Sequence, residues 1–178
     1  MKKIGVFCAS SDKMERNYYD AAYSLGEWIG QTGRTLVYGG ANCGLMEAVA
    51  KGTKDGGGTV YGVVPQKLVR SGRVSECIDI TFYCNDLSDR KQYLVDESDI
   101  LIVLPGSVGT LDEAFCALAA NTFGMHQKQV IFWNINGFYD LLFQFLDSLE
   151  GTGVLNKPWN ELLYKVTTLE EIKEICEK

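Results

Sequence analysis

Short apolar runs alternate with longer amphipathic segments along the whole chain, and this alternation constrains the fold more than any other feature. Strands joined through helices form right-handed βαβ units, so the sequence predicts one α/β domain over residues 1–178 with a doubly wound parallel sheet. The predicted strands are Ile4–Ala9, Thr35–Tyr38, Thr59–Val64, Ile80–Cys84, Asp99–Leu104, Gln129–Trp133 and Leu163–Val166. The predicted helices are Tyr18–Thr32, Leu45–Lys54, Leu87–Glu97, Leu111–Phe123, Tyr139–Leu149 and a last one beginning at the capping box Thr168-Leu169-Glu170-Glu171.

The segment Leu104–Glu113 (Leu-Pro-Gly-Ser-Val-Gly-Thr-Leu-Asp-Glu) carries the strongest functional signal. It links a predicted strand to a predicted helix through a Pro-Gly break. Free N–H groups and the positive dipole end of a helix N-terminus bind anions, and glycines let a phosphate approach the backbone. We therefore expect a phosphate site at Gly106, Ser107, Val108, Gly109 and Thr110. Glu113, expected in the first helical turn, is unfavourable beside a phosphate, so its presence predicts chemistry as well as binding.

A second glycine-rich turn, Gly39-Gly40-Ala41-Asn42-Cys43-Gly44, follows the predicted strand Thr35–Tyr38. Ligands of open α/β sheets bind beyond the carboxyl ends of the strands, so two such turns on neighbouring strands are expected to grip one ligand. Neither turn matches the dinucleotide fingerprint G-x-G-x-x-G, and no lysine precedes Thr110 as a P-loop requires. A dinucleotide cofactor is therefore not expected, and Gly39 and Gly40 join the predicted binding residues.

Asp89-Arg90-Lys91 opens the predicted helix Leu87–Glu97. Two cations in a first turn oppose the helix dipole, so their placement indicates an anion nearby. We favour this interpretation for Arg90, whereas a solvated lysine and a ligand-binding lysine fit Lys91 equally well. His126 is the only histidine and follows a predicted helix in a loop, where a polar surface residue is the simplest interpretation. Without a second histidine a histidine-based metal site is not available, and no metal is expected.

Charge and hydropathy argue against nucleic acid and membrane partners. The formal net charge is −6, whereas nucleic acid binding needs a clustered basic surface. Lys67, Arg70 and Arg73 do cluster, and we interpret them as a solvated loop. The first apolar run is too short for a signal peptide, and none approaches the roughly 20 residues that span a bilayer.

The six cysteines show neither a C-x-x-C pair nor metal-ligand spacing. Cys8, Cys84 and Cys116 lie in apolar patterns, where free thiols pack as small hydrophobes. Together with the missing signal peptide, this predicts a reduced, cytoplasmic protein.

In combination these motifs resemble the LOG (lonely guy) family, Rossmann-like cytokinin riboside 5′-monophosphate phosphoribohydrolases once mislabelled "lysine decarboxylase". The family motif P-G-G-x-G-T-x-x-E is matched by Pro105, Gly106, Gly109, Thr110 and Glu113, with Val108 at the free position. The family's Arg-Lys pair is matched by Arg90-Lys91. The similarity covers essentially the whole chain, including Val6–Ser11, Tyr38–Met46, Gly124–Lys128 and Asn136–Asp140.

Three positions depart from the family pattern. Ser107 replaces the second motif glycine, and Ser88 and Glu47 stand where many members have His and Gly. If position 107 needs a positive φ, serine is strained there; otherwise its hydroxyl adds a donor for the phosphate. The changes at Ser88 and Glu47 bear on base specificity more than on the reaction.

The resemblance implies hydrolysis of the N-glycosidic bond of a purine nucleoside 5′-monophosphate, AMP or an N6-substituted AMP, to free base and ribose 5-phosphate. Its oxocarbenium-like transition state suits a carboxylate near the sugar C1, the role expected of Glu113, with Arg90 holding the substrate and orienting Glu113. The helix N-terminus is expected to help keep Glu113 ionised. Ser10, Lys91 and the glycine-rich turns would bind the nucleotide, and no cofactor is required.

The main alternative is a non-catalytic nucleotide or molybdenum-cofactor (pterin) carrier on the same fold, because fold alone does not fix function. A pure phosphate binder gains nothing from a carboxylate beside its ligand, so Arg90 and Glu113 favour the enzyme. Literal lysine decarboxylation would need pyridoxal phosphate on a Schiff-base lysine, and no lysine belongs to the glycine-turn constellation. A third possibility, a nucleotide-sensing interaction module, has no separate support.

A homodimer with the site at or near its two-fold interface is also expected. One domain of this size offers a shallow cleft that a partner's helices can complete. The predicted helices Leu111–Phe123 and Leu87–Glu97 are more apolar than one sheet-facing stripe requires, and the resemblance points to dimers as well. The apolar residues concerned are Phe115, Leu118, Ala119, Phe123, Leu87, Tyr93 and Leu94.

Overall fold

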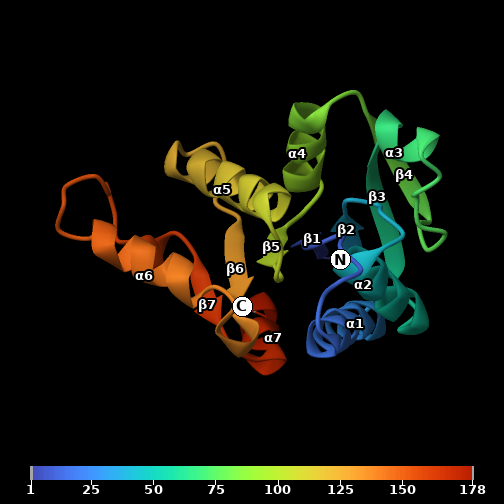
Figure 1. Ribbon diagram of the computed structural model, residues 1–178, viewed down its shortest axis with the longest axis horizontal. Coiled ribbons are helices and arrows are strands. Elements are labelled where there is room, and N and C mark those ends of the chain that lie inside the picture. Colours follow the sequence, from blue (N-terminus) through green and yellow to red (C-terminus); the bar gives the residue numbers. More distant parts are fainter. Residues whose placement is uncertain (1, 178) are drawn as a thin grey trace.

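The computed structural model describes residues 2–177, which form a seven-stranded sheet with helices on both faces (Figure 1). The strands are β1 (Lys3–Phe7), β2 (Thr35–Tyr38), β3 (Thr59–Pro65), β4 (Ile80–Cys84), β5 (Ile100–Val103), β6 (Gln129–Trp133) and β7 (Tyr164–Val166). The helices are α1 (Arg16–Gln31), α2 (Gly44–Asp55), α3 (Gln66–Arg70), α4 (Leu87–Asp96), α5 (Val108–Thr122), α6 (Asp140–Leu149) and α7 (Leu169–Glu177), with 3₁₀ turns η1 (Ile135–Gly137) and η2 (Trp159–Glu161).

The strand order is β4-β3-β2-β1-β5-β6-β7, and every neighbouring pair is parallel. The predicted α/β class and doubly wound parallel sheet are therefore confirmed. The chain builds outward from β1 to β4 and then returns to the other side of β1 with β5. This reversal between β1 and β5 is a topological switch point, where two loops diverge and leave room for a ligand.

We expected the two glycine-rich turns to follow neighbouring strands, and this prediction is wrong. One follows β2 and the other follows β5, and these strands flank β1 on opposite sides. The β1 loop runs between the two turns and is tied to the second, because the Ala9 N–H donates to the Pro105 carbonyl at 3.1 Å. Ser10 therefore stands between the turns at the same edge of the sheet.

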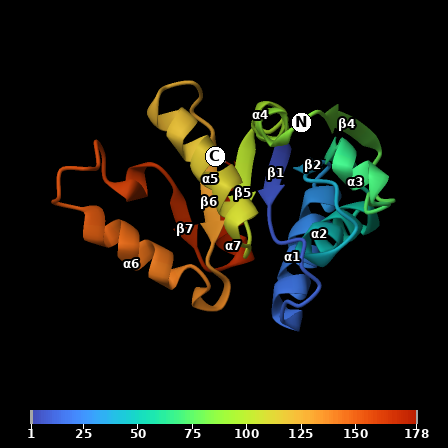
Figure 2. The ribbon, with the colours of Figure 1, turned by 45° about the horizontal axis from the view of Figure 1, so that its top comes forward.

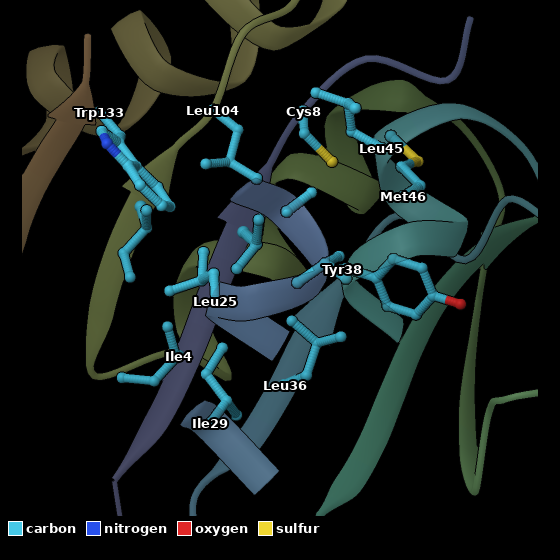
Figure 3. Close-up of a cluster of buried hydrophobic side chains, with 14 of the residues drawn as sticks. Ile4, Cys8, Leu25, Ile29, Leu36, Tyr38, Leu45, Met46, Leu104 and Trp133 are labelled. Carbon is cyan, nitrogen blue, oxygen red and sulfur yellow. The ribbon is translucent and has the colours of Figure 1, made fainter. Parts of the chain in front are cut away.

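Alternate strand residues enter two separate cores. On one face, α1, α2 and α7 cover a cluster that includes Ile4, Leu36 and Ile102 (Figure 3). On the other face, α4, α5 and α6 cover a cluster that includes Val37 and Leu101. Figures 1 and 2 show α5 across the strands from α1 and α2. Both faces of the sheet are thus buried, as parallel sheets require.

Most predicted elements appear with boundaries shifted by a few residues, and one shift matters. The helix predicted from Leu111 begins at Val108, so Glu113 lies in the second turn of α5 and not in its first. The short helix α3 falls in a connection for which no element is predicted. At α7 the predicted capping box is confirmed, because the Glu171 carboxylate accepts from the Thr168 N–H and the Thr168 hydroxyl accepts from the Glu171 N–H.

The cysteine predictions hold for two of the three residues. Cys8 and Cys84 are buried, whereas Cys116 is exposed on the outer face of α5. All six cysteines are free thiols in the structure. None of the helices within residues 2–177 is both long enough and apolar enough to cross a membrane.

Candidate functional site

A cavity of about 250 Å³ opens at the carboxyl ends of β1, β2 and β5, and we call it the Glu113 cavity. Four connections converge on it, because it is lined by residues that follow β1, β2, β3 and β5 and by Arg90 from α4. Of the predicted site residues, it brings together Ser10, Gly39, Arg90, Ser107, Gly109, Thr110 and Glu113. The remaining lining is Cys8, Ala9, Ala41, Met46, Pro65 and Leu68.

A buried ion pair forms the inner wall of this cavity. Arg90 Nη1 donates to Glu113 Oε1 at 2.5 Å, and only 14% and 6% of the two side chains are exposed. The second guanidinium nitrogen, Nη2, donates to the Gly39 carbonyl at 3.3 Å. A side chain at Gly39 would overlap that nitrogen, so this glycine is needed for the close approach of Arg90. The buried Arg90 Nε has no partner within residues 2–177, which leaves one N–H donor for a ligand.

The environment of Glu113 differs from the expectation that the helix N-terminus keeps it ionised. Burial raises the pKa of the Glu113 carboxyl above its ordinary value, and the Arg90 charge acts against that rise. Because the side chain starts from the second turn of α5, the counter-charge from Arg90 takes the place of the helix terminus. A carboxylate with a raised pKa is a stronger base than an ordinary one, which suits it to accepting a proton.

The N-terminus of α5 presents unpaired donors to the cavity. Within residues 2–177, no acceptor is found for the N–H groups of Val108, Gly109 and Thr110, and Ser107 provides no side-chain cap. Ser107 has a φ of −104°, so its replacement of the family glycine carries no backbone strain. No atom lies within 4 Å of the position a side chain at Gly109 would occupy, so the protein itself does not require this glycine. These features suit an anion seated on the helix terminus.

The N-terminus of α2 is closed by the protein itself. The Asp12 carboxylate accepts from the Gly44 N–H at 2.8 Å, and the Ala9 carbonyl accepts from the N–H groups of Leu45 and Met46. The first three N–H groups of α2 are therefore not available to an anion, and the first glycine-rich turn contributes Gly39 and Ala41 to the cavity wall. Gly40 lies behind that wall: it has a φ of +77°, and a side chain there would meet Val64. Of the two helices that follow these turns, α5 has N–H groups without an acceptor in its first turn within residues 2–177, whereas the first three N–H groups of α2 are occupied.

Several predicted residues lie outside the cavity. Lys91 pairs with Asp112 Oδ1 at 2.9 Å and lines a hollow between α4 and α5 that also contains Ser88. Glu47 faces a larger hollow, of about 820 Å³, beside α1 and α2, where no other predicted site residue is found. Val108 is 81% exposed at the start of α5. The two departures at Ser88 and Glu47 therefore do not touch the Glu113 cavity within one chain.

Sequence reasoning missed the apolar part of the lining. Met46 and Leu68 come from α2 and α3, and Pro65 ends β3. The rule that places ligands at the carboxyl ends of strands also applies to β3, so the sequence could have predicted Pro65 as a lining residue. It could not have predicted Leu68, because α3 is too short to give a periodic pattern.

Comparisons with known proteins show which family this chain is similar to. A family model described as "Possible lysine decarboxylase" matches residues 46–176. A cytokinin riboside 5′-monophosphate phosphoribohydrolase of Arabidopsis thaliana is 32% identical over 177 residues, which is 99% of this chain and 82% of the relative. A probable enzyme of the same name from Oryza sativa subsp. japonica is 36% identical over 154 residues, 86% of this chain and 68% of the relative.

Two solved structures are also similar in fold and sequence. A molybdenum cofactor binding protein from Rippkaea orientalis superposes with a TM-score of 0.76 at 27% identity, covering 99% of this chain and 95% of that one. The molybdenum cofactor carrier protein of Chlamydomonas reinhardtii gives a TM-score of 0.74 at 25% identity, with 99% of both chains covered.

The buried pair predicts a pH-dependent loss of stability. Arg90→Gln removes the counter-charge and raises the pKa of Glu113 further, so the variant should lose about 3–5 kcal/mol at neutral pH. A carboxyl whose pKa is higher in the folded than in the unfolded state favours folding as pH falls, so the loss should shrink in mildly acidic buffer. Urea unfolding at both pH values measures this.

Lys91→Gln is the matched control, because it breaks a pair in which half of the Asp112 side chain is exposed. We expect a loss of at most about 1 kcal/mol that depends little on pH. Equal losses for the two variants at both pH values would contradict the buried-charge account.

Proposed function

The chain belongs to the LOG family, and from that premise we propose that it hydrolyses the N-glycosidic bond of a purine nucleoside 5′-monophosphate, releasing free base and ribose 5-phosphate. The relatives reported above carry the name of this enzyme class. AMP and N6-substituted AMP are the substrates proposed. The observation that carries the proposal is the buried Glu113 carboxylate, which shares one cavity with the free N–H groups of α5.

Each part of the cavity has a task in this reaction. The N–H groups of Gly109 and Thr110, with the helix dipole behind them, hold the 5′-phosphate. That contact positions the sugar so that its C1 lies beside Glu113, and binding energy from the phosphate serves orientation. Arg90 holds the Glu113 carboxylate in one orientation and offers its Nε–H to the substrate.

The bond changes follow from these positions. The bond between C1 and the base nitrogen lengthens first, and positive charge develops on the sugar ring as an oxocarbenium-like species. Glu113 stabilises that charge and orients a water molecule, whose oxygen forms the new bond to C1 while the carboxylate accepts a proton. The departing base takes up a proton from solvent, and Glu113 later returns its proton to solvent, so the carboxylate is restored and one water molecule is consumed. The products are the neutral base and ribose 5-phosphate, and no cofactor enters the scheme.

The cofactor-carrier alternative has one specific observation in its favour. The two solved structures reported above bind or carry the molybdenum cofactor and share the fold over 99% of this chain. Against it stands Glu113, since a carrier of an anionic pterin gains nothing from a carboxylate buried beside its phosphate site. The same assay decides between the two functions, because a carrier releases no base.

We also propose a homodimer that brings the site close to a two-fold interface. Exposed apolar side chains gather on α4, on α5 and on the loop that follows α5: Leu87, Tyr93, Val108, Phe115, Phe123 and Met125. Leu94 and Leu118, predicted to belong to this surface, are buried within the chain instead. An apolar surface beside a shallow site is suited to an isologous contact between two copies.

The substrate prediction concerns the phosphate. AMP, or an N6-substituted AMP, should be cleaved, whereas the corresponding nucleosides should not, because the α5 terminus positions the sugar through the phosphate. Chromatography of free base released from a panel of nucleoside 5′-monophosphates and nucleosides measures this. Comparable turnover of AMP and adenosine would contradict the role of the α5 terminus.

The dimer prediction uses two exposed phenylalanines. Phe123, 87% exposed after α5, lies in the proposed interface, whereas Phe145, 59% exposed, lies on α6. Light scattering should give about twice the chain mass for the natural protein and for Phe145→Asp. Phe123→Asp should be monomeric and less active. A monomer with full activity would contradict the shared site, and a monomeric Phe145→Asp would place the contact on α6.

A further inference from the structure

A second cavity adjoins the Glu113 cavity at the loops after β1 and β5. It has a volume of about 530 Å³ and is lined by Ala9, Ser10, Ser11, Met14, Arg73, Gly106, Ser107 and Phe138; we call it the Arg73 cavity. The two cavities share Ala9, Ser10 and Ser107. A ligand seated on the α5 terminus therefore borders both of them.

Arg73 is positioned by backbone contacts made far away in the sequence. Its carbonyl accepts from the Asn42 N–H at 3.0 Å, and the Ser75 N–H donates to the Gly40 carbonyl at the same distance. Ala41 and Val74 form an isolated antiparallel bridge between these contacts. The segment around Arg73 is thus fastened to the first glycine-rich turn. Lys67, Arg70 and Arg73 are all exposed, as the interpretation of this cluster as solvated predicts.

The charge of Arg73 has no carboxylate partner. Its Nη2 donates to the Cys43 thiol at 3.0 Å, and Arg73 takes part in no ion pair within residues 2–177. Arg73 is also the only charged side chain that lines its cavity. A thiol satisfies one donor of the guanidinium and leaves the charge available to an anion.

We propose that Arg73 binds the 5′-phosphate of the nucleotide and thereby fixes the direction in which the substrate lies. The inference rests on the proposed function. The Glu113 carboxylate, which lines only the Glu113 cavity, repels a phosphate, whereas Arg73, which lines only the Arg73 cavity, attracts one. The phosphate then lies between the α5 N–H groups and Arg73, with the hydroxyls of Ser10 and Ser107 as neighbouring donors.

This direction also assigns the base. With the phosphate toward Arg73 and the sugar beside Glu113, the base lies against the apolar wall of the Glu113 cavity. That wall is formed by Met46, Pro65 and Leu68, apolar side chains suited to the face of a purine and to an alkyl group on it. In the opposite orientation the base would lie against Phe138, and the phosphate would lose Arg73.

Arg73→Gln tests the assignment, with Arg70→Gln as the matched control. Arg70 ends α3 in the same basic cluster, is exposed and lines neither cavity. For Arg73→Gln we expect the KM for AMP to rise roughly 10–100-fold, the range for losing one hydrogen bond to a charged group, with a smaller fall in kcat because the α5 N–H groups still orient the phosphate. Inhibition by inorganic phosphate should weaken in parallel, and Arg73→Lys should restore part of both. Arg70→Gln should match the natural protein.

Three results would overturn the proposal. One is an unchanged KM and an unchanged phosphate inhibition in Arg73→Gln. A fall in kcat with no change in KM would be another, because it indicates a role in chemistry and not in phosphate binding. The third is an altered preference among bases with unchanged phosphate inhibition, which would place the base, and not the phosphate, beside Arg73.

Calorimetric binding of AMP to the natural protein and to Arg73→Gln separates this inference from the proposed function. If no nucleotide is hydrolysed but AMP binds and Arg73→Gln weakens it, the hydrolase fails and the phosphate site stands. If AMP is hydrolysed and binds Arg73→Gln as tightly as the natural protein, the proposed hydrolase function stands and the phosphate assignment fails. If AMP neither binds nor reacts, both fail.

Discussion

The ion pair between Arg90 and Glu113 is the interaction on which the rest of the site depends. It joins α4 to α5 across the ends of the strands, and the Gly39 carbonyl adds the turn after β2 to the same guanidinium. Burying two charges costs desolvation energy that offsets most of their mutual attraction, so a buried ion pair is weak evidence for stability alone. Its value here is geometric. It holds one carboxylate, with a pKa raised by burial, beside the free N–H groups of a helix terminus.

The sheet topology explains why these groups meet. The strand order reverses between β1 and β5, so the loops after these strands diverge at one edge of the sheet. The β5 loop is fixed from both sides, because the Ala9 N–H donates to the Pro105 carbonyl and the Tyr139 hydroxyl donates to the Leu104 carbonyl at 2.7 Å. The N-terminus of α5 therefore has one position, whereas the α2 terminus, occupied by Asp12 and Ala9, cannot compete for the same anion.

Local patterns predicted the parts of the site that depend on strand ends. Ser10, Gly39 and Gly109 were all accessible from the rule that ligands lie beyond the carboxyl ends of parallel strands. The start of α5 was misplaced because glycine and threonine are poor helix formers, and Val108-Gly109-Thr110 resembles a turn. Because the predicted helix began three residues too late, Glu113 was placed in the first turn of α5, one turn too close to the positive end of the helix dipole.

Contacts between distant segments were beyond the sequence. The sequence around Lys91 does not indicate that its ion-pair partner is Asp112, on the next helix. Arg73 joins the site only because residues 73–75 pair with residues 40–42, a contact that no local rule indicates. The cluster of basic residues was visible, but which of them faces a cavity depends on the tertiary fold.

The turnover of Glu113→Gln tests the central claim most directly. The amide keeps the size of the side chain and an acceptor for Arg90 but cannot accept a proton from water. A folded Glu113→Gln protein, checked by circular dichroism, should still bind AMP and should release base roughly 10²–10⁴ times more slowly than the natural protein, the range for losing a positioned acid–base group. Base release at the natural rate by the folded variant would contradict the account and favour a nucleotide or cofactor carrier.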